Sequence, residues 1–149
     1  MLQCNNLYHK ENDMGEVFAD ITLKNAEDIG YAHRGGIKAE EVREITVTAV
    51  VDTGASTICI TEDVFSKLGL RIINQSTATV ADGRSVECSK TSPVDIHWED
   101  RSCSIRATLI PGSKEILLGV IPLEDMDLIV DPQNQKLIGA HGDKPVFRI

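Results

Sequence analysis

Residues 47–57 read VTAVVDTGAST, an apolar and β-branched run that leads directly into Asp-Thr-Gly at 52–54. β-Branched residues favour an extended strand, and glycine permits the tight turn that follows. A carboxylate at the end of a buried strand is costly to ionise unless it accepts hydrogen bonds. Gly54 lets backbone N–H groups approach Asp52 closely, and Ser56 adds a hydroxyl. These features are typical of a positioned acid or base.

Taken alone, the Asp-Thr-Gly triplet is weak, because an aspartate that accepts backbone N–H bonds in a strand-ending turn also explains it. The context favours a function. Residues 115–131, EILLGVIPLEDMDLIVD, repeat the order of apolar run, glycine and short helix. This second copy carries Gly119 but no aspartate at the matching place.

Most of the remaining chain has the patterns of strands and turns. Thr61 and Gly69 predict a short helix over 62–68 through its cap and its end, and a second short helix is expected near Pro122. Residues 26–41, rich in glycine and charge, read as an exposed loop. Single strands are predicted at 15–25, 42–51, 57–60, 128–130, 135–140 and 144–149. Two hairpins are predicted between them: one over 76–89, with Asp82 and Gly83 at its two positive-φ positions, and one over 92–112 that turns at Glu99-Asp100.

Composition narrows the class of protein. The length of 149 residues predicts one domain over 1–149, with its core at about residues 15–140. Because aromatic residues make up only 4% of the chain, the buried side chains are expected to be mostly aliphatic. A net charge of −8 argues against a nucleic-acid partner. No apolar stretch approaches the ~20 residues that span a membrane, so no membrane partner is expected.

The four cysteines show no C-x-x-C pair, and the four histidines show no metal-ligand spacing. We therefore expect no metal and no cofactor. The N-terminus lacks the pattern of a secretory signal, which favours a cytoplasmic protein and free thiols over a disulfide.

The sequence AVVDTGAS, the ILLG element and the Asp-Gly hairpin between them together resemble the retropepsin-like (retroviral-type) aspartic proteases, in particular their small bacterial and archaeal single-domain members. The resemblance covers about residues 15–140. It implies an all-β, mainly antiparallel fold, a closed acid-protease-like barrel with one or two short helices. It also implies an aspartic endopeptidase that cleaves peptide or protein substrates.

The resemblance also implies roles for particular residues. Asp52 matches the catalytic aspartate, and the active-site loop continues through Thr53, Gly54, Ala55 and Ser56. The second apolar-Gly element matches Leu117, Leu118 and Gly119. The flap, a hairpin that closes over bound peptide, matches Val80, Ala81, Asp82 and Gly83. The flap tip is polar here, and Val120 stands where the viral enzymes carry an arginine. Ala55, the flap near 80–86 and the residues around Ile110 and Ile121 suggest a substrate pocket for apolar side chains.

One Asp-Thr-Gly motif per chain implies a homodimer, in which two Asp52 carboxylates meet at one active site. Two carboxylates that lie close together share one proton, so one activates a water while the other polarises the peptide carbonyl. Two other interpretations stay open. A protease-like dimer without activity would serve as a binding or assembly module. An actin-like ATPase loop also follows an apolar strand, but the chain lacks a glycine-rich phosphate loop.

Overall fold

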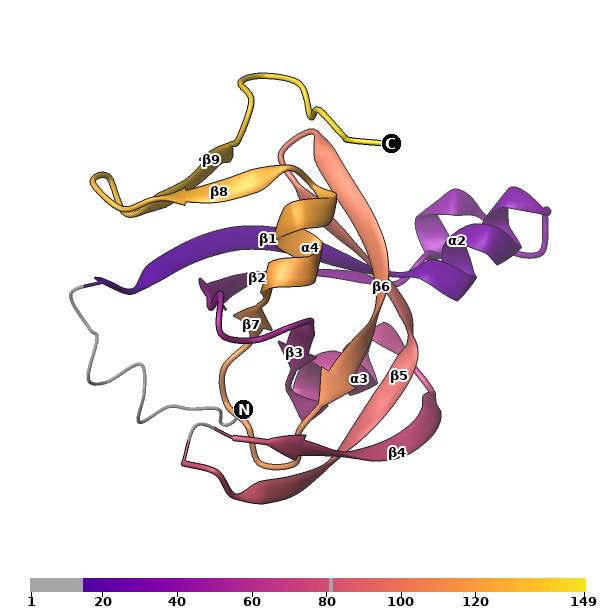
Figure 1. Cartoon of the computed structure of the whole chain (residues 1–149). Coiled ribbons are helices and arrows are strands. Elements are labelled where there is room, and N and C mark those ends of the chain that lie inside the picture. The colour runs from indigo at the N-terminus through magenta and orange to yellow at the C-terminus, as the bar shows by residue number, and fades with distance from the viewer. Residues whose placement is uncertain (1–14, 81) are drawn as a thin grey trace.

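The computed structural model describes residues 15–80 and 82–149. Strands hold far more of these residues than helices do, and the three α-helices are short, so the prediction of a mainly β fold is confirmed (Figure 1). The strands are β1 Val17–Asn25, β2 Glu44–Val51, β3 Ile58–Ile60, β4 Ile72–Thr79, β5 Ser85–Trp98, β6 Arg101–Leu109, β7 Leu117–Leu118, β8 Leu128–Asp131 and β9 Lys136–Gly139. The helices are α2 Ala26–His33, the 3-10 turn η2 Ala39–Glu41, α3 Glu62–Leu68 and α4 Val120–Asp125.

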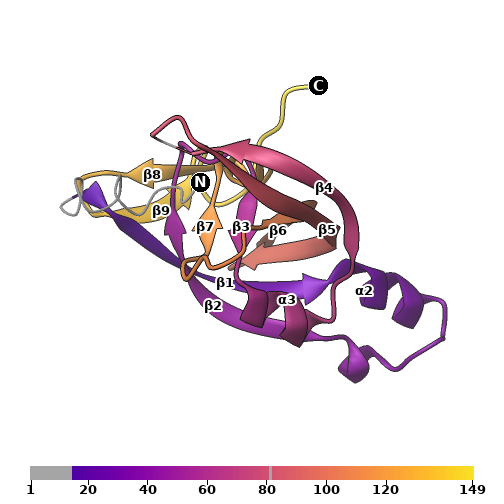
Figure 2. The same ribbon diagram turned by 90° about the horizontal axis from the view of Figure 1, so that it is seen from below.

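Seven strands form one sheet in the order β1-β2-β7-β3-β6-β5-β4, and β1 also pairs with β5. Most pairs are antiparallel, whereas β2 with β7 and β3 with β6 run parallel. Figure 2 shows the short strand β7 between β2 and β3. Strands β8 and β9 form a separate hairpin. The closed barrel stays a prediction.

Strand β1 and helix α3 follow the sequence patterns closely. Alternate residues of β1, from Val17 to Asn25, are buried, as a period of two requires for a strand with one face on the core. The Thr61 hydroxyl accepts a hydrogen bond from the Val64 N–H at 3.2 Å, which caps α3. Gly69 ends this helix in the left-handed region with φ 64°.

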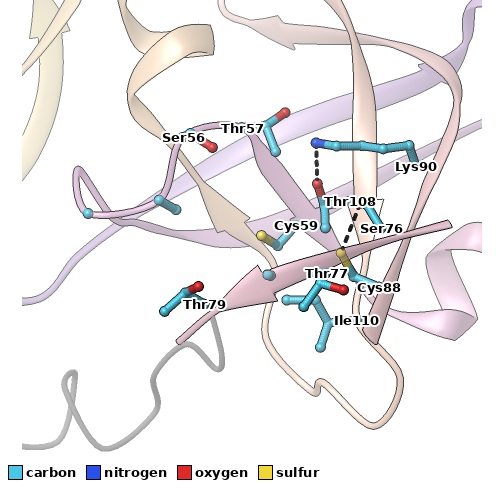
Figure 3. A pocket seen from close by; sticks show the side chains of 13 residues that line it. Ser56, Thr57, Cys59, Ser76, Thr77, Thr79, Cys88, Lys90, Thr108 and Ile110 are labelled. Carbon is cyan, nitrogen blue, oxygen red and sulfur yellow. Dashed lines mark hydrogen bonds between the residues drawn. The ribbon is translucent and has the colours of Figure 1, made fainter. Parts of the chain in front are cut away.

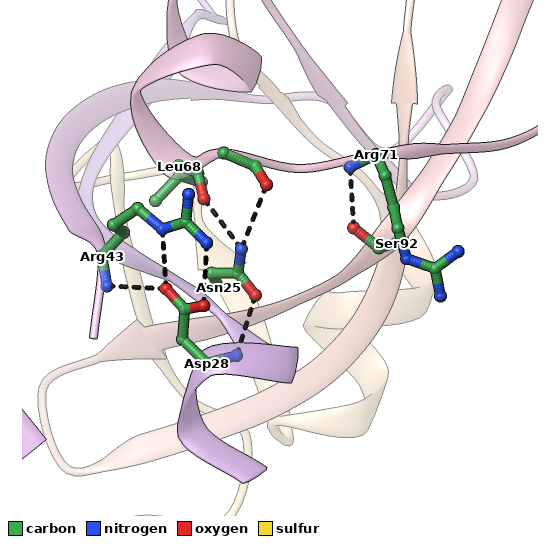
Figure 4. Close-up of polar contacts among 7 residues, drawn as sticks. Asn25, Asp28, Arg43, Leu68, Arg71 and Ser92 are labelled. Atoms are coloured by element: carbon green, nitrogen blue, oxygen red, sulfur yellow. Dashed lines mark hydrogen bonds and ion pairs between the residues drawn. The ribbon is translucent and has the colours of Figure 1, made fainter. Parts of the chain in front are cut away.

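The expectation of an exposed loop over 26–41 is wrong, because Ala26–His33 form helix α2. The Asn25 side chain caps the helix by accepting from the Asp28 N–H at 3.0 Å, and its amide donates to the Leu68 carbonyl at 2.8 Å (Figure 4). The Asp28 carboxylate accepts two hydrogen bonds from the Arg43 guanidinium, at 2.8 and 2.9 Å. The Asn25 amide thus ties the start of α2 to the end of α3, and Asp28 ties α2 to Arg43, directly before β2.

One further detail corrects the sequence analysis, and two turns agree with it. In the β4–β5 hairpin Gly83 has a positive φ of 88°, as predicted, and the Asp82 carboxylate accepts a hydrogen bond from the Arg84 N–H at 3.0 Å. Residues 144–149 form no strand in the described chain. The Val146 N–H is instead bound by the Asp127 carboxylate at 2.9 Å, which holds this segment outside the sheet. The turn at Glu99-Asp100 is confirmed, with φ 51° at Glu99.

No helix within residues 15–80 and 82–149 is long and apolar enough to cross a membrane. In the same residues, no group of three or more histidine, cysteine or acidic side chains is placed to hold a metal ion. Cys59, Cys88 and Cys103 are buried free thiols.

Candidate active site

The loop at 52–57 joins the two strands that flank β7. Strand β2 runs parallel to β7, with Val51 opposite Leu118, and β3 runs antiparallel to it, with Ile58 opposite the same leucine. The Asp52 N–H continues the ladder by donating to the Leu118 carbonyl at 3.0 Å. The chain therefore has to pass around the end of β7, and Asp52 lies at the start of that passage.

The Asp52 carboxylate is held by the loop that it begins. Its side chain accepts a hydrogen bond from the Gly54 N–H at 2.9 Å, and only 8% of the residue is exposed. The Ala55 N–H donates to the Asp52 carbonyl at 3.0 Å, which closes the turn. Thr53 and Gly54 are exposed, whereas Ala55 is buried. The tip of the loop is therefore exposed to solvent, next to the Asp52 carboxylate, which the Gly54 N–H holds in a fixed orientation.

The second apolar-Gly element braces this loop from inside. Helix α4 begins after Gly119, and its first N–H groups point at the loop. The Val120 N–H donates to the Ala55 carbonyl, and the Ile121 N–H donates to the Ser56 carbonyl, both at 2.9 Å. A side chain at position 119 would overlap the carbonyl groups of Ala55 and Thr57, so glycine is required for the close approach.

The β4–β5 hairpin lies over the same region. Val80 is 5% exposed and belongs to a small apolar cluster with Ala55 and Leu117. The Val80 N–H pairs with the Arg84 carbonyl at 2.9 Å and closes the tip. Asp82 and Gly83 are exposed at the tip, and Ala81 lies outside the described residues. The structure therefore brings together the loop, the apolar-Gly element and the base of the predicted flap.

A cavity of about 300 Å³ opens between the loop and the hairpin (Figure 3). Residues 54–57 line it from the loop and residues 76–79 line it from β4. The rest of its wall comes from three other strands and the residue after β6: Cys59, Cys88, Lys90, Thr108 and Ile110. Hydroxyl groups therefore make up much of the wall.

This lining differs from the apolar pocket that we expected from the sequence. Ala55 and Ile110 do line the cavity, but Ile121 is 49% exposed and is not part of it. Sequence reasoning missed Lys90 and Thr108. The alternation of side chains along β5 places Cys88 and Lys90 on one face and could have indicated Lys90, but it carries no information on Thr108 of β6.

The comparisons with known proteins agree with this geometry. A family model described as gag-polyprotein putative aspartyl protease matches residues 40–125, which include Asp52, the hairpin and Gly119. The match covers more than half of the chain. The chain belongs to this aspartyl protease family. The resemblance to retropepsin-like aspartic proteases is thereby confirmed, and it points to a protease function.

Two solved structures are similar to this member of the aspartyl protease family. The EIAV protease in complex with the inhibitor HBY-793 is 24% identical, over 54% of this chain and 76% of its own, with a TM-score of 0.43. A retropepsin-like aspartic protease from Rickettsia conorii is 17% identical, over 78% of this chain and 85% of its own, with a TM-score of 0.44. No curated protein matches the chain.

Proposed function

We propose that the chain is an aspartic endopeptidase whose active site forms in a homodimer, with Asp52 of each subunit as the catalytic acid and base. The proposal rests on the position of Asp52, which lies within the residues 40–125 that the family model matches. Its carboxylate lies at the end of β2 and is oriented by the Gly54 N–H, next to an exposed loop tip.

A dimer supplies the second acid that one chain lacks. The described structure repeats the apolar strand and glycine at 117–119, but this copy braces the loop and carries no carboxylate. In a two-fold dimer the same surface meets itself, so the exposed tips at Thr53 and Gly54 would face each other and bring two Asp52 side chains together. We also propose a closed barrel of strands and a cytoplasmic location. The free thiols of Cys59, Cys88 and Cys103 are compatible with that location.

The chemistry follows from two carboxylates at short range. Like charges disfavour a doubly ionised pair, so one proton is shared between the two Asp52 side chains. The ionised carboxylate takes a proton from a water as that water attacks the peptide carbonyl. The protonated partner donates a hydrogen bond to the carbonyl oxygen, where negative charge develops. The proton that was taken up then passes to the leaving amine.

The hairpin tip at 80–84 is the proposed flap. Its buried Val80 anchors the base against Ala55, while Asp82 and Arg84 form an exposed ion pair at the tip, 2.6 Å between Nε and Oδ2. A polar tip would contact peptide backbone and solvent more than apolar side chains.

The test is cleavage of a peptide library between about pH 4 and 7, the range in which a shared-proton carboxylate pair operates. The wild-type protein should cut peptides, and Asp52→Asn should abolish cleavage. If the wild-type dimer cuts no peptide over this range, the inactive binding or assembly module is the better description.

The variant Asp52→Asn needs a folding control. An asparagine keeps an Oδ1 acceptor for the Gly54 N–H, so thermal unfolding should change little or shift upward, because the like charges are removed. Val50→Asp, which buries a charge at a residue only 5% exposed, should unfold the protein. Unfolding of Asp52→Asn would show that this residue mainly builds the turn.

A further inference from the structure

Lys90 reaches the wall of the cavity from strand β5. It pairs with Asn74 of β4 and Thr108 of β6, and the β5–β6 register shifts directly after it, before Pro93. Such irregularities change the direction of a strand and of its side chains. The Lys90 Nζ donates to the Thr108 Oγ1 at 2.8 Å, and Figure 3 shows this bond between two of the side chains that line the cavity.

Lys90 is the only Lys, Arg, Asp or Glu among the described residues that line this cavity. An ammonium group has three donors, and the hydroxyl of Thr108 takes one of them. Within residues 15–80 and 82–149, no carboxylate lies within 4.0 Å of the Lys90 Nζ. Burial raises the pKa of the nearby Cys59 thiol to about 11, so this group stays neutral. Among the described residues, the cavity wall therefore carries one basic side chain, and no carboxylate forms an ion pair with it.

We propose that the cavity is a substrate subsite that selects an acidic side chain, glutamate or aspartate, and that Lys90 is its specificity-determining residue. The inference rests on the proposed peptidase function. A carboxylate would accept a charge-assisted hydrogen bond from Lys90, and such bonds are stronger than neutral ones. The surrounding hydroxyls of Thr77 and Thr108 suit a polar guest better than an aliphatic one.

The size and the position of the cavity fit this role. A volume of about 300 Å³ holds a side chain and some water, since a water takes ~30 Å³ in the liquid. Gly54 and Ala55 line the cavity, and both are hydrogen-bonded to Asp52. The guest side chain therefore belongs to a residue close to the peptide bond that is cut.

The net charge of the chain limits the kind of substrate. At −8 the protein repels strongly acidic peptides at long range. The local charge of Lys90 acts over a shorter distance and within a partly enclosed space, where charges interact more strongly than in water. The predicted substrate is a largely neutral peptide with one acidic residue near the cleavage position.

The experiment uses acetylated and amidated octapeptides in which one position at a time is Glu, Gln or Lys and the others are mixed. For the wild-type protein we expect kcat/KM to favour Glu over Gln by about tenfold at one position, as a hydrogen bond to a charged group implies. This ratio should rise as the pH increases through about 4.3, where glutamate ionises, and should then level off. Lys90→Met should bring the ratio to about one, Lys90→Glu should favour Lys, and Lys90→Arg should keep the preference for Glu.

A matched control separates the local charge from the net charge. Lys67→Met removes the same charge from the exposed face of α3, away from the cavity, and should leave the Glu to Gln ratio unchanged. Cleavage without any preference for Glu, or a preference that survives Lys90→Met, would overturn the subsite while leaving the peptidase in place.

Binding provides a readout that needs no cleavage. The same peptides are titrated into Asp52→Asn and into Asp52→Asn with Lys90→Met. A lower Kd for the Glu peptides in the first protein, lost in the second, supports the subsite even if the wild-type protein cuts nothing. Equal Kd values for the Glu and Gln peptides in the first protein refute it.

Discussion

Gly119 lies directly against the Ala55 carbonyl: a Cβ built at position 119 would be 2.5 Å from that oxygen and would also overlap the carbonyl oxygen of Thr57. Both neighbours are backbone atoms of the active-site loop, so neither has a rotamer that relieves the overlap. The glycine of the second element therefore sets how closely α4 approaches the loop that carries Asp52.

The first prediction concerns this contact. Gly119→Ala should destabilise the protein by about 1–3 kcal/mol, the usual cost of overpacking, and should also displace the loop. Urea denaturation measures the free energy of unfolding, and peptide cleavage reports on the loop. The matched control is Gly30→Ala in α2, where a Cβ meets nothing within 4 Å and should stabilise by about 0.5–1 kcal/mol. Equal stability of the two variants would contradict the close contact.

A second prediction concerns Asn25, which is 2% exposed and joins two helices. Asn25→Ala removes the cap of α2 and the donor to the Leu68 carbonyl, so it should cost about 2–4 kcal/mol, the sum of a lost cap and an unsatisfied buried group. Asn25→Ser keeps a capping oxygen and loses only the donor, so its loss in urea denaturation should be clearly smaller. Equal losses would show that the cap contributes nothing.

This helix shows where sequence reasoning failed. Gly30, Gly35 and Gly36 suggested a loop, but Asn25 followed by Glu27 and Asp28 is an N-cap with acidic residues in the first turn. The local signal was present and was outweighed by glycine content. Helix α3 was predicted with its correct bounds because Thr61 and Gly69 mark both of its ends.

The candidate site, too, could be predicted from the sequence only in part. The order of strand, Asp52, loop and Gly119 was predictable because these residues are contiguous or repeat a local pattern. The polar cavity was not, because Lys90 and Thr108 meet only through the register of β5 and β6. Residues 144–149 have a strand-like pattern, but Asp127 holds the Val146 N–H that a sheet would need.

A third prediction follows from Asp127 and pH. Hydrogen bonds from the Val146 N–H and from His141 hold the pKa of this carboxyl below its usual value. A lowered folded pKa stabilises the fold above the unfolded value of about 3.9, and the stabilisation is lost as pH falls through the folded value. Asp127→Asn should therefore lower Tm at pH 6, and the difference from wild type should shrink below about pH 4. A constant difference would contradict the linkage.

A fourth prediction concerns thiol reactivity. Burial raises the pKa of Cys59 to about 11 and that of Cys103 to about 12, and the thiolate is the reactive form. Iodoacetamide at about pH 8 should therefore label both positions slowly in the native protein and rapidly in urea. Peptide mapping by mass spectrometry measures each rate. Native labelling at position 59 as fast as in urea would show that this thiol is accessible.

The most direct test of the central claim mixes wild-type protein with Asp52→Asn at constant total concentration, after the subunits have exchanged. If each active site needs one Asp52 from each of two subunits, an equal mixture should keep about a quarter of the wild-type cleavage rate, because only wild-type pairs are active. A rate near one half would mean that each chain acts alone, and it would contradict the shared site.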